Sequence, residues 1–163
     1  MMEEDPLHEK AKQRAFRLLA VRARSEKELR TKLKERGYDE SVVGDVTARL
    51  RELKYLDDES FAREWARNLA VNRLLGNRRI EASLREKGIP RELIEQVITE
   101  VREELSEHKA LIALFRKKGN KITIKMGDRE KSRLARSLIG KGFSPDLVFD
   151  ILRSKEGFVD EGE

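Results

Sequence analysis

Apolar residues recur three or four positions apart along most of the chain, with charged residues between them. Leu29 and Leu33, for example, are one helical turn apart and share one face of a helix. Phe61 and Trp65 repeat this spacing, which favours a place in the core over a platform for stacking bases. Only residues 121–126 alternate as a strand would, and they have no visible partner strand. The pattern therefore predicts an all-α protein.

Three segments of the chain align on a glycine, at positions 37, 88 and 142. In each segment, apolar residues stand eight and four positions before the glycine, directly after it, and along the helix that follows. The aligned positions are Leu29, Leu33, Gly37, Tyr38, Val42, Val43 and Val46; Ile80, Leu84, Gly88, Ile89, Leu93, Ile94 and Val97; and Leu134, Leu138, Gly142, Phe143, Leu147, Val148 and Ile151. This agreement, at a period of about fifty residues, indicates an internal repeat.

Residues near the expected helix ends support the repeat. Ser25 and Glu28 have the spacing of a capping box. Each repeated glycine suits the left-handed position that follows many helices. Asp39 and Ser144 then stand where the next helix needs an N-cap, and Pro90 takes the matching place in the second segment.

We predict three tandem three-helix units, because one short amphipathic unit cannot bury both of its faces alone. The units are expected to stack in an elongated, curved array that is right-handed or solenoid-like. The predicted boundaries are a disordered end at 1–8, units at 9–56, 57–105 and 106–155, and a C-terminal tail at 156–163. Residues 118–128 replace the tight helix connection of the other units and predict a longer loop.

Composition removes several classes of protein. The 163 residues include no Cys, which excludes disulfides, thiolate zinc sites and a cysteine nucleophile. His8, in the expected disordered end, and His108 are far apart, and we expect both to be solvated. Asp57 and Asp58 are interpreted as helix-start residues rather than as a cation site. Without a phosphate-binding or catalytic motif, we expect no enzyme activity, no cofactor and no metal.

Location and assembly follow from the same composition. No apolar run reaches the roughly 18 to 20 residues of a membrane span. Residues 1–10 are polar and acidic, unlike a secretory signal. We therefore expect a cytoplasmic protein without membrane contact, and we expect it to be a monomer.

Charged residues make up 41% of the chain, and 36 basic residues outnumber 31 acidic ones. The excess is local, since residues 10–36 hold eleven bases and three acids and residues 109–141 hold eleven and two. If the units stack regularly, these bases form a row that can follow a polyanion backbone. The predicted basic stripe consists of Arg22, Arg24, Lys27, Arg30, Arg73, Arg78, Arg79, Arg85, Arg116, Lys117, Lys118, Lys121, Lys125 and Arg129. The alternative is an ordinary solvated surface whose bases are balanced by nearby acids.

The helices expected after the glycine turns are acidic in the first two units. Glu40 and Asp45 lie on the first of them, and Glu95 and Glu100 on the second. In a helix-turn-helix protein this second helix enters the major groove, where phosphates would repel such carboxylates. Sequence-specific duplex binding is therefore disfavoured, and any contact with nucleic acid is expected to be nonspecific and salt-dependent.

Three ordered blocks of sequence carry a family resemblance. They are Leu18-Leu19-Ala20-Val21-Arg22-Ala23-Arg24-Ser25-x-x-Glu28-Leu29-x3-Leu33, Tyr55-Leu56-Asp57-Asp58-Glu59-Ser60-Phe61-Ala62, and Gly76-Asn77-Arg78-Arg79-Ile80-x3-Leu84-x2-Lys87-Gly88-Ile89. Together, over about residues 10–155, they resemble the RecX family, bacterial regulators of the recombinase RecA.

The resemblance implies a noncatalytic modulator of RecA, mostly an inhibitor, built from three tandem three-helix repeats. Proteins of this kind lie along the RecA–single-stranded DNA filament, bind single-stranded DNA weakly and nonspecifically, and restrain strand exchange, ATP hydrolysis and coprotease activity. One alternative is a helical-repeat DNA-binding or transcriptional regulatory protein without RecA dependence. Another is a protein–protein scaffold with no role at nucleic acids.

Overall fold

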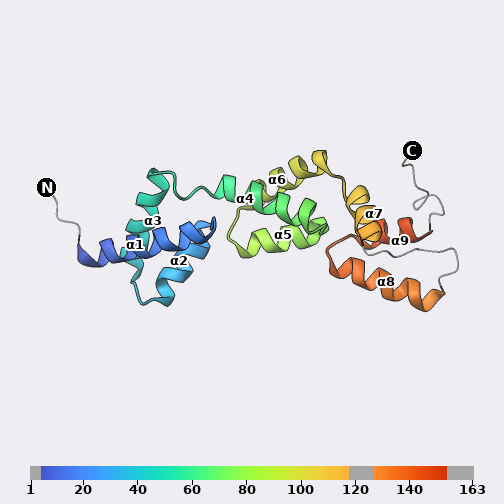
Figure 1. Cartoon of the computed structure of the whole chain (residues 1–163), viewed down its shortest axis with the longest axis horizontal. Coiled ribbons are helices and arrows are strands. Elements are labelled where there is room, and N and C mark those ends of the chain that lie inside the picture. Colours follow the sequence, from blue (N-terminus) through green and yellow to red (C-terminus); the bar gives the residue numbers. More distant parts are fainter. Residues whose placement is uncertain (1–4, 118–126, 154–163) are drawn as a thin grey trace.

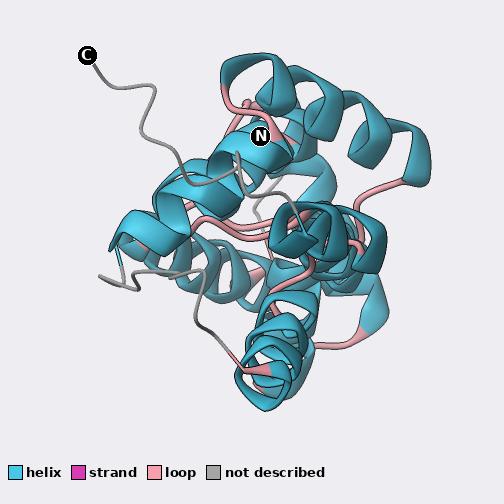
Figure 2. Ribbon diagram, turned by 90° about the vertical axis from the view of Figure 1, so that its right-hand side faces the viewer, coloured by secondary structure: helices cyan, strands magenta, loops and turns pink. Residues whose placement is uncertain are grey.

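The computed structural model describes residues 5–117 and 127–153, and within these ranges it contains helices and loops but no strand (Figures 1 and 2). The α-helices are α1 (Pro6–Val21), α2 (Glu26–Glu35), α3 (Glu40–Glu52), α4 (Asp58–Arg67), α5 (Asn77–Glu86), α6 (Arg91–Glu104), α7 (Glu107–Lys117), α8 (Asp128–Gly140) and α9 (Pro145–Arg153). A π-helical segment, η1 (Asn68–Asn72), continues α4. No helix in the described ranges is long and apolar enough to cross a membrane.

The first helix begins earlier than the sequence suggested. Residues 6–8 were expected in the disordered end, but α1 starts at Pro6. The Asp5 side chain caps this helix by accepting a hydrogen bond of 3.1 Å from the Leu7 amide, and Pro6 occupies the first turn. A capping aspartate followed by proline is a strong helix start, which explains the difference. The 118–128 loop falls almost wholly outside the described residues.

The three glycine turns adopt the predicted left-handed conformation. Gly37, Gly88 and Gly142 have φ angles of +91°, +79° and +100°. After α2, the Tyr38 amide donates to the Leu33 carbonyl at 3.3 Å, the long hydrogen bond of a Schellman motif. Equivalent bonds follow Gly88 and Gly142. The repeat seen in the sequence is therefore a repeat of backbone geometry.

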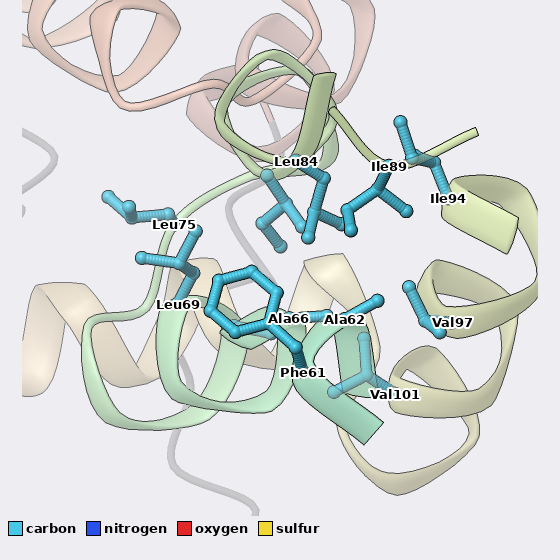
Figure 3. Close-up of a cluster of buried hydrophobic side chains, with 12 residues drawn as sticks. Phe61, Ala62, Ala66, Leu69, Leu75, Leu84, Ile89, Ile94, Val97 and Val101 are labelled. Carbon is cyan, nitrogen blue, oxygen red and sulfur yellow. The ribbon is translucent and has the colours of Figure 1, made fainter. Parts of the chain in front are cut away.

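Each group of three helices has its own hydrophobic core. We call α1–α3 the first unit, α4–α6 with η1 the second, and α7–α9 the third. Leu33, Leu84 and Leu138, which precede the glycine turns, are at most 2% exposed. Figure 3 shows the core of the second unit, where Leu84 and Phe61 belong to one cluster of side chains. The repeated apolar positions thus build three small cores in place of one large core.

The units follow one another along the long axis of an elongated body (Figure 1). The second helices of the units, α2, α5 and α8, lie along the lower edge in this view, whereas α3 and α6 lie along the upper edge. This arrangement confirms the predicted tandem all-α repeat. It also places the basic second helices on one long side of the molecule.

One irregular segment joins η1 to α5. The π-helix η1 widens the end of α4, and Leu74 has a φ of +53°, a conformation rare for a residue with a side chain. The Leu74 side chain is buried among third-unit residues, although it belongs to the second unit in sequence. The strained turn therefore anchors the second unit to the third.

Candidate nucleic-acid interface

The middle of the basic stripe has its charges free for a partner. Arg73 follows η1, and Arg78 and Arg79 stand in the first turn of α5. All three are exposed, and none forms an ion pair with a carboxylate in the described part of the chain. Three guanidinium groups near the start of one helix suit phosphate oxygens or carboxylates.

The start of α5 is held in place by the third unit. The Gly76 amide donates to the Lys141 carbonyl at 2.9 Å, and the Arg78 amide donates to the Gly142 carbonyl at 3.1 Å. A Cβ on Gly76 would lie 2.3 Å from the Gly142 carbonyl carbon, so the two backbones touch. This contact satisfies amides that a helix start leaves unpaired. It also brings Lys141 to the helix that carries Arg78 and Arg79.

Side chains also hold the second and third units together, at what we call the second joint; the first joint is the contact between the first and second units. Glu107 of α7 accepts a hydrogen bond of 2.8 Å from the Asn77 amide. Arg102 of α6 donates to the Asn77 side chain at 2.7 Å and to the Leu75 and Leu105 carbonyls. Burial lowers the pKa of Arg102, which nonetheless stays charged because arginine does not deprotonate in proteins. Arg102 therefore stabilises the contact between the second and third units and is not assigned to a binding surface.

In the first unit the predicted stripe residues are largely occupied. Arg22 forms an ion pair with Glu28, and Arg30 pairs with Glu40 at 3.1 Å. Arg24 donates to the Leu18 carbonyl at 3.3 Å, and burial followed by repulsion from Arg22 lowers its pKa. These three bases stabilise the fold of the first unit. A polyanion would have to compete for them with carboxylates or carbonyls.

The first joint is built on Glu28. Lys87 of the second unit lies 3.2 Å from the Glu28 carboxylate, which also receives Arg22 and the Ser25 amide. Burial opposes ionisation, but hydrogen bonds from Arg22, Ser25 and Lys87 outweigh it, and the pKa of Glu28 lies below its ordinary value. The Lys87 ammonium lies 5.0 Å from the centre of the Trp65 ring. Glu28 and Trp65 thus join the two units, and Asp58 adds a hydrogen bond from the Glu26 amide.

Two further residues of the predicted stripe, Lys27 and Arg85, differ in whether they form an ion pair within the protein. Lys27 is exposed and packs its aliphatic stem on the second glycine turn, where a Cβ on Gly88 would lie 2.8 Å from the Lys27 Cβ. No described carboxylate pairs with its ammonium. Arg85 is exposed but pairs with Glu81, one turn earlier on α5, at 2.6 Å. Exposed pairs of this type are weak and easily exchanged for another anion.

The third unit supplies stripe residues at two helix ends. Arg116 and Lys117 are exposed at the end of α7, and Arg129 is exposed in the first turn of α8. Lys118, Lys121 and Lys125 lie outside the described residues. Among the exposed residues of the predicted stripe, six form no ion pair with a carboxylate of the described ranges: Lys27, Arg73, Arg78, Arg79, Lys117 and Arg129. Three of these six belong to the second unit.

Acidic residues on the opposite edge are paired with bases of their own. Glu100 and Glu104 on α6 accept hydrogen bonds of 3.1 Å from Arg63 and Arg67 on α4. On α3, Asp45 accepts a hydrogen bond of 2.9 Å from His8. His8 was expected to be solvated in a disordered end, but it lies on α1 and joins that helix to α3.

The one acidic cluster noted in the sequence has structural roles. Asp57 caps α4 by accepting the Glu59 and Ser60 amides, and Asp58 accepts the Glu26 amide of the first unit at 2.9 Å. Burial raises the pKa of Asp58. Within the described ranges, no group of His, Asp or Glu side chains has the geometry of a metal site.

Sequence reasoning missed the residues that join the units. The contacts that Lys87 and Lys141, the bases before the second and third glycine turns, make with the previous unit were not foreseen. Trp65 was assigned to the core, and it does stack on Phe61 with ring centres 5.5 Å apart, yet it is only half-buried and also faces the first unit. Only Lys87 uses its basic side chain in a joint; Lys141 contributes its backbone carbonyl, which no sequence pattern reports.

Comparison with known proteins agrees with this architecture. Residues 11–50, 57–98 and 106–152 match the first, second and third three-helix domains of RecX. The chain is 32% identical to the regulatory protein RecX of Mycolicibacterium smegmatis, over 88% of this chain and 78% of that protein. It is also 32% identical to the RecX of Geobacillus thermodenitrificans, over 94% of this chain and 57% of the relative.

Solved structures give the same result. The crystal structure of RecX from Lactobacillus salivarius superposes with a TM-score of 0.74 at 22% identity, covering 90% of this chain and 94% of that one. A second crystal structure, of a regulatory protein RecX, has a TM-score of 0.71 at 27% identity and covers 90% and 71% of the two chains. Fold, domain order and sequence identity agree, and this chain belongs to the RecX family of regulatory proteins.

Proposed function

We propose that this protein is a noncatalytic modulator, mostly an inhibitor, of RecA. It binds along the RecA–single-stranded DNA filament and restrains strand exchange, ATP hydrolysis and coprotease activity. The observation that carries the proposal is the row of second helices, α2, α5 and α8, on one long edge of the body, with unpaired bases on each (Figure 1). A filament is a long partner, and an elongated surface can contact it over several subunits.

The charges support a partner that contains both phosphate and protein. Lys27, Arg78 and Arg129, one on each second helix, have no described carboxylate partner and can replace counterions on a DNA backbone. The opposite edge is acidic, so the protein presents a basic side rather than a uniformly positive surface. We propose that contact with single-stranded DNA alone is weak and nonspecific, and that the protein acts as a monomer.

The proposal requires no chemistry from the chain itself. Within the described ranges there is no metal cluster, and the perturbed carboxylates Glu28 and Asp58 are explained by contacts between units. Binding alone is sufficient to slow filament growth or strand exchange. We therefore propose a cytoplasmic protein that acts by occupying the filament.

Purified RecA provides the direct test. Filament assembly on single-stranded DNA and ATP hydrolysis are measured while this protein is added up to a stoichiometric amount. We expect both activities to fall, with a larger effect on filaments than on RecA without DNA. Unchanged assembly and unchanged ATP hydrolysis at stoichiometric protein would contradict the proposal.

The basic edge is tested by replacing Arg78 and Arg79 together with alanine. Binding to the filament or to single-stranded DNA should weaken, and its dependence on salt should fall by a slope of about 1 for each phosphate contact that is lost. Exposed sites of this kind change stability by less than about 0.5 kcal/mol, so circular dichroism should show the same helix content.

A matched control removes two arginines from the opposite edge. Arg49 on α3 and Arg91 on α6 are exposed and pair only with neighbours on their own helices. Replacing both with alanine changes the net charge by the same amount but should leave binding nearly intact. Equal losses in the two double variants would show that total charge, rather than the basic edge, determines binding.

The alternative is a helical-repeat DNA-binding or transcriptional regulator that does not depend on RecA. It is distinguished by competition between random single-stranded, random duplex and selected duplex DNA. Strong preference for one duplex sequence would favour this alternative. The paired carboxylates of α3 and α6, which follow the glycine turns, weigh against entry of these helices into a major groove.

A further inference from the structure

A small pocket lies in the second unit, between the end of α4 with η1 and the outer side of α5. Its volume is about 300 Å³. Apolar walls come from Trp65, Leu69, Leu75 and Ala82. Leu69 and Leu75 stand at one edge of the core cluster in Figure 3, so the pocket is continuous with buried apolar surface. This volume is at the lower end of the range for ligand pockets, and it is sufficient for one side chain of a partner.

Charge is unevenly distributed around this pocket. Arg73, which directly follows η1, and Arg79, in the first turn of α5, both line the pocket, and neither forms an ion pair with a described residue. Glu86 lines the pocket at the end of α5, seven residues after Arg79, or about 10 Å along the helix. The pocket therefore has a cationic end, an apolar middle and an acidic end. This order of charges favours a ligand that binds in one orientation, with its negative group toward the arginines.

The backbone beside the pocket is irregular. The π-helical segment Asn68–Asn72 and the left-handed Leu74 bracket Arg73. π-Helical turns and residues with strained φ angles concentrate at functional sites, because a regular helix would be more stable. A regular α-helical continuation would change the position of Arg73 relative to Arg79. The irregular turn, which also carries Leu74 into the core of the third unit, thus fixes where Arg73 stands beside the pocket.

We propose that this pocket binds a peptide segment of a partner protein in which an apolar side chain stands next to a carboxylate. The apolar side chain enters between Leu69 and Ala82, and the carboxylate lies between Arg73 and Arg79. The residue at the Glu86 end carries no negative charge. For the identity of the partner the inference rests on the proposed function, under which this pocket contacts the protein component of the filament.

The observations favour a peptide over a nucleotide. Proteins bind single-stranded DNA by stacking bases on aromatic rings. The Trp65 ring already contacts Phe61 and the Lys87 ammonium, and its indole N–H donates to the Ser83 hydroxyl at 2.9 Å. Glu86 would also repel a chain that carries a phosphate at every step. Under this assignment Arg79 contacts protein, whereas Arg78 on the same turn remains for DNA.

Trp65 gives a direct readout, because it is the only tryptophan in the chain. Its fluorescence is recorded while the full-length protein is titrated with the peptide acetyl-Asp-Leu-Leu-amide. The comparison probes are acetyl-Asn-Leu-Leu-amide, which lacks the charge, and oligothymidylate. We expect the acidic peptide to change the emission. The uncharged peptide should bind with an affinity at least about tenfold lower.

Variants locate the binding. The double variant Arg73→Ala, Arg79→Ala should bind the acidic peptide only as weakly as the wild type binds the uncharged one. The control variant Arg49→Ala, Arg91→Ala should keep the affinity of the wild type. Ala82→Phe should block the pocket and abolish the response; Ala20→Phe, at another exposed helical alanine, should leave it intact. Circular dichroism confirms that each variant folds.

The outcomes separate the pocket from the proposed function, since the titration contains no RecA. No response to the acidic peptide, or a response that survives both Ala82→Phe and the arginine double variant, would overturn the peptide site. A response to oligothymidylate that Ala82→Phe removes would also overturn it, in favour of a nucleotide. Loss of filament binding in Ala82→Phe, with single-stranded DNA binding intact, would identify the partner as the filament protein.

Discussion

At the scale of single residues, the backbones of Gly76 and Gly142 lie in close contact. The first glycine caps α5, and the second turns the chain between α8 and α9. A Cβ on Gly142 would lie 2.4 Å from the Arg79 Cβ, so both positions exclude a side chain. This contact positions Arg78 and Arg79 against the third unit.

Gly76→Ala should therefore destabilise the protein. The added Cβ meets backbone atoms, which cannot move aside as a flexible side chain could, and we expect a loss of about 1–3 kcal/mol in the free energy of unfolding. Urea denaturation measures it. Gly44→Ala is the control, because a Cβ there meets nothing within 4 Å in the middle of α3. The control should gain about 0.5–1 kcal/mol.

His8 predicts a dependence of stability on pH. The hydrogen bond to Asp45 raises the pKa of His8 above its ordinary value of 6.5. The folded state then holds the proton more tightly than the unfolded state, so the contribution is complete below pH 6.5 and is lost as the pH rises through the folded pKa. The advantage of the wild type over His8→Gln in urea denaturation should therefore shrink as the pH rises from 6.5 through the folded pKa of His8. A constant difference would mean that the pair carries no charge coupling.

Local signals in the sequence were enough for some of these residues and not for others. Gly37 and Ser25 were assigned correctly because a glycine turn and a capping box involve neighbours within one helical end. The contact between Gly76 and Gly142 joins positions 66 residues apart, and the His8–Asp45 bond joins two helices. No periodicity reports such pairs, so both came only from the structure.

At the scale of helices, hydrophobic spacing determined the elements well. The repeated leucines are buried as expected, and the helix ends follow the predicted caps and glycines. The irregular η1 was not foreseen, since Asn68–Asn72 has no glycine or proline to mark a departure from the α-helix. Its cause lies in tertiary packing, where Leu74 reaches the core of the next unit.

Leu84→Ala tests how strongly one helix depends on its core. Leu84 is fully buried in the second unit and contributes to the cluster in Figure 3. Removing its side chain should leave a cavity and cost about 2–5 kcal/mol, measured by urea denaturation. Leu53→Ala, at a partly exposed site just after α3, is expected to cost much less. Similar losses at the two sites would contradict the assignment of Leu84 to the core.

At the scale of the whole molecule, the basic stripe is only partly what the sequence suggested. The row of second helices on one edge agrees with the expectation (Figure 1). Arg22 and Arg30, however, form ion pairs with Glu28 and Glu40, because the turns after α1 and α2 bring these acids back against them. Summed charge along the chain could locate a basic segment, but it could not show which bases have intramolecular partners.

Glu28→Gln tests the first joint. The substitution removes the charge that Arg22 and Lys87 share, and small-angle X-ray scattering should show a broader distribution of overall lengths with helix content unchanged. Because the pKa of Glu28 is lowered in the folded state, its contribution is present above pH 4.5 and is lost as the pH falls through the folded pKa. The wild type should therefore approach the variant in acid. Identical scattering profiles at neutral pH would argue against this role.

The two joints between the units depend on different kinds of interaction. The second is fastened by backbone hydrogen bonds and by the half-buried Arg102. In the first, the polar contacts involve charged side chains, namely Glu28 with Lys87 and Asp58 with the Glu26 amide. Salt weakens interactions between charges, whereas it has little effect on hydrogen bonds between neutral backbone groups. We therefore expect the second and third units to move together as one rigid body. The orientation of the first unit relative to them should vary more as the salt concentration rises.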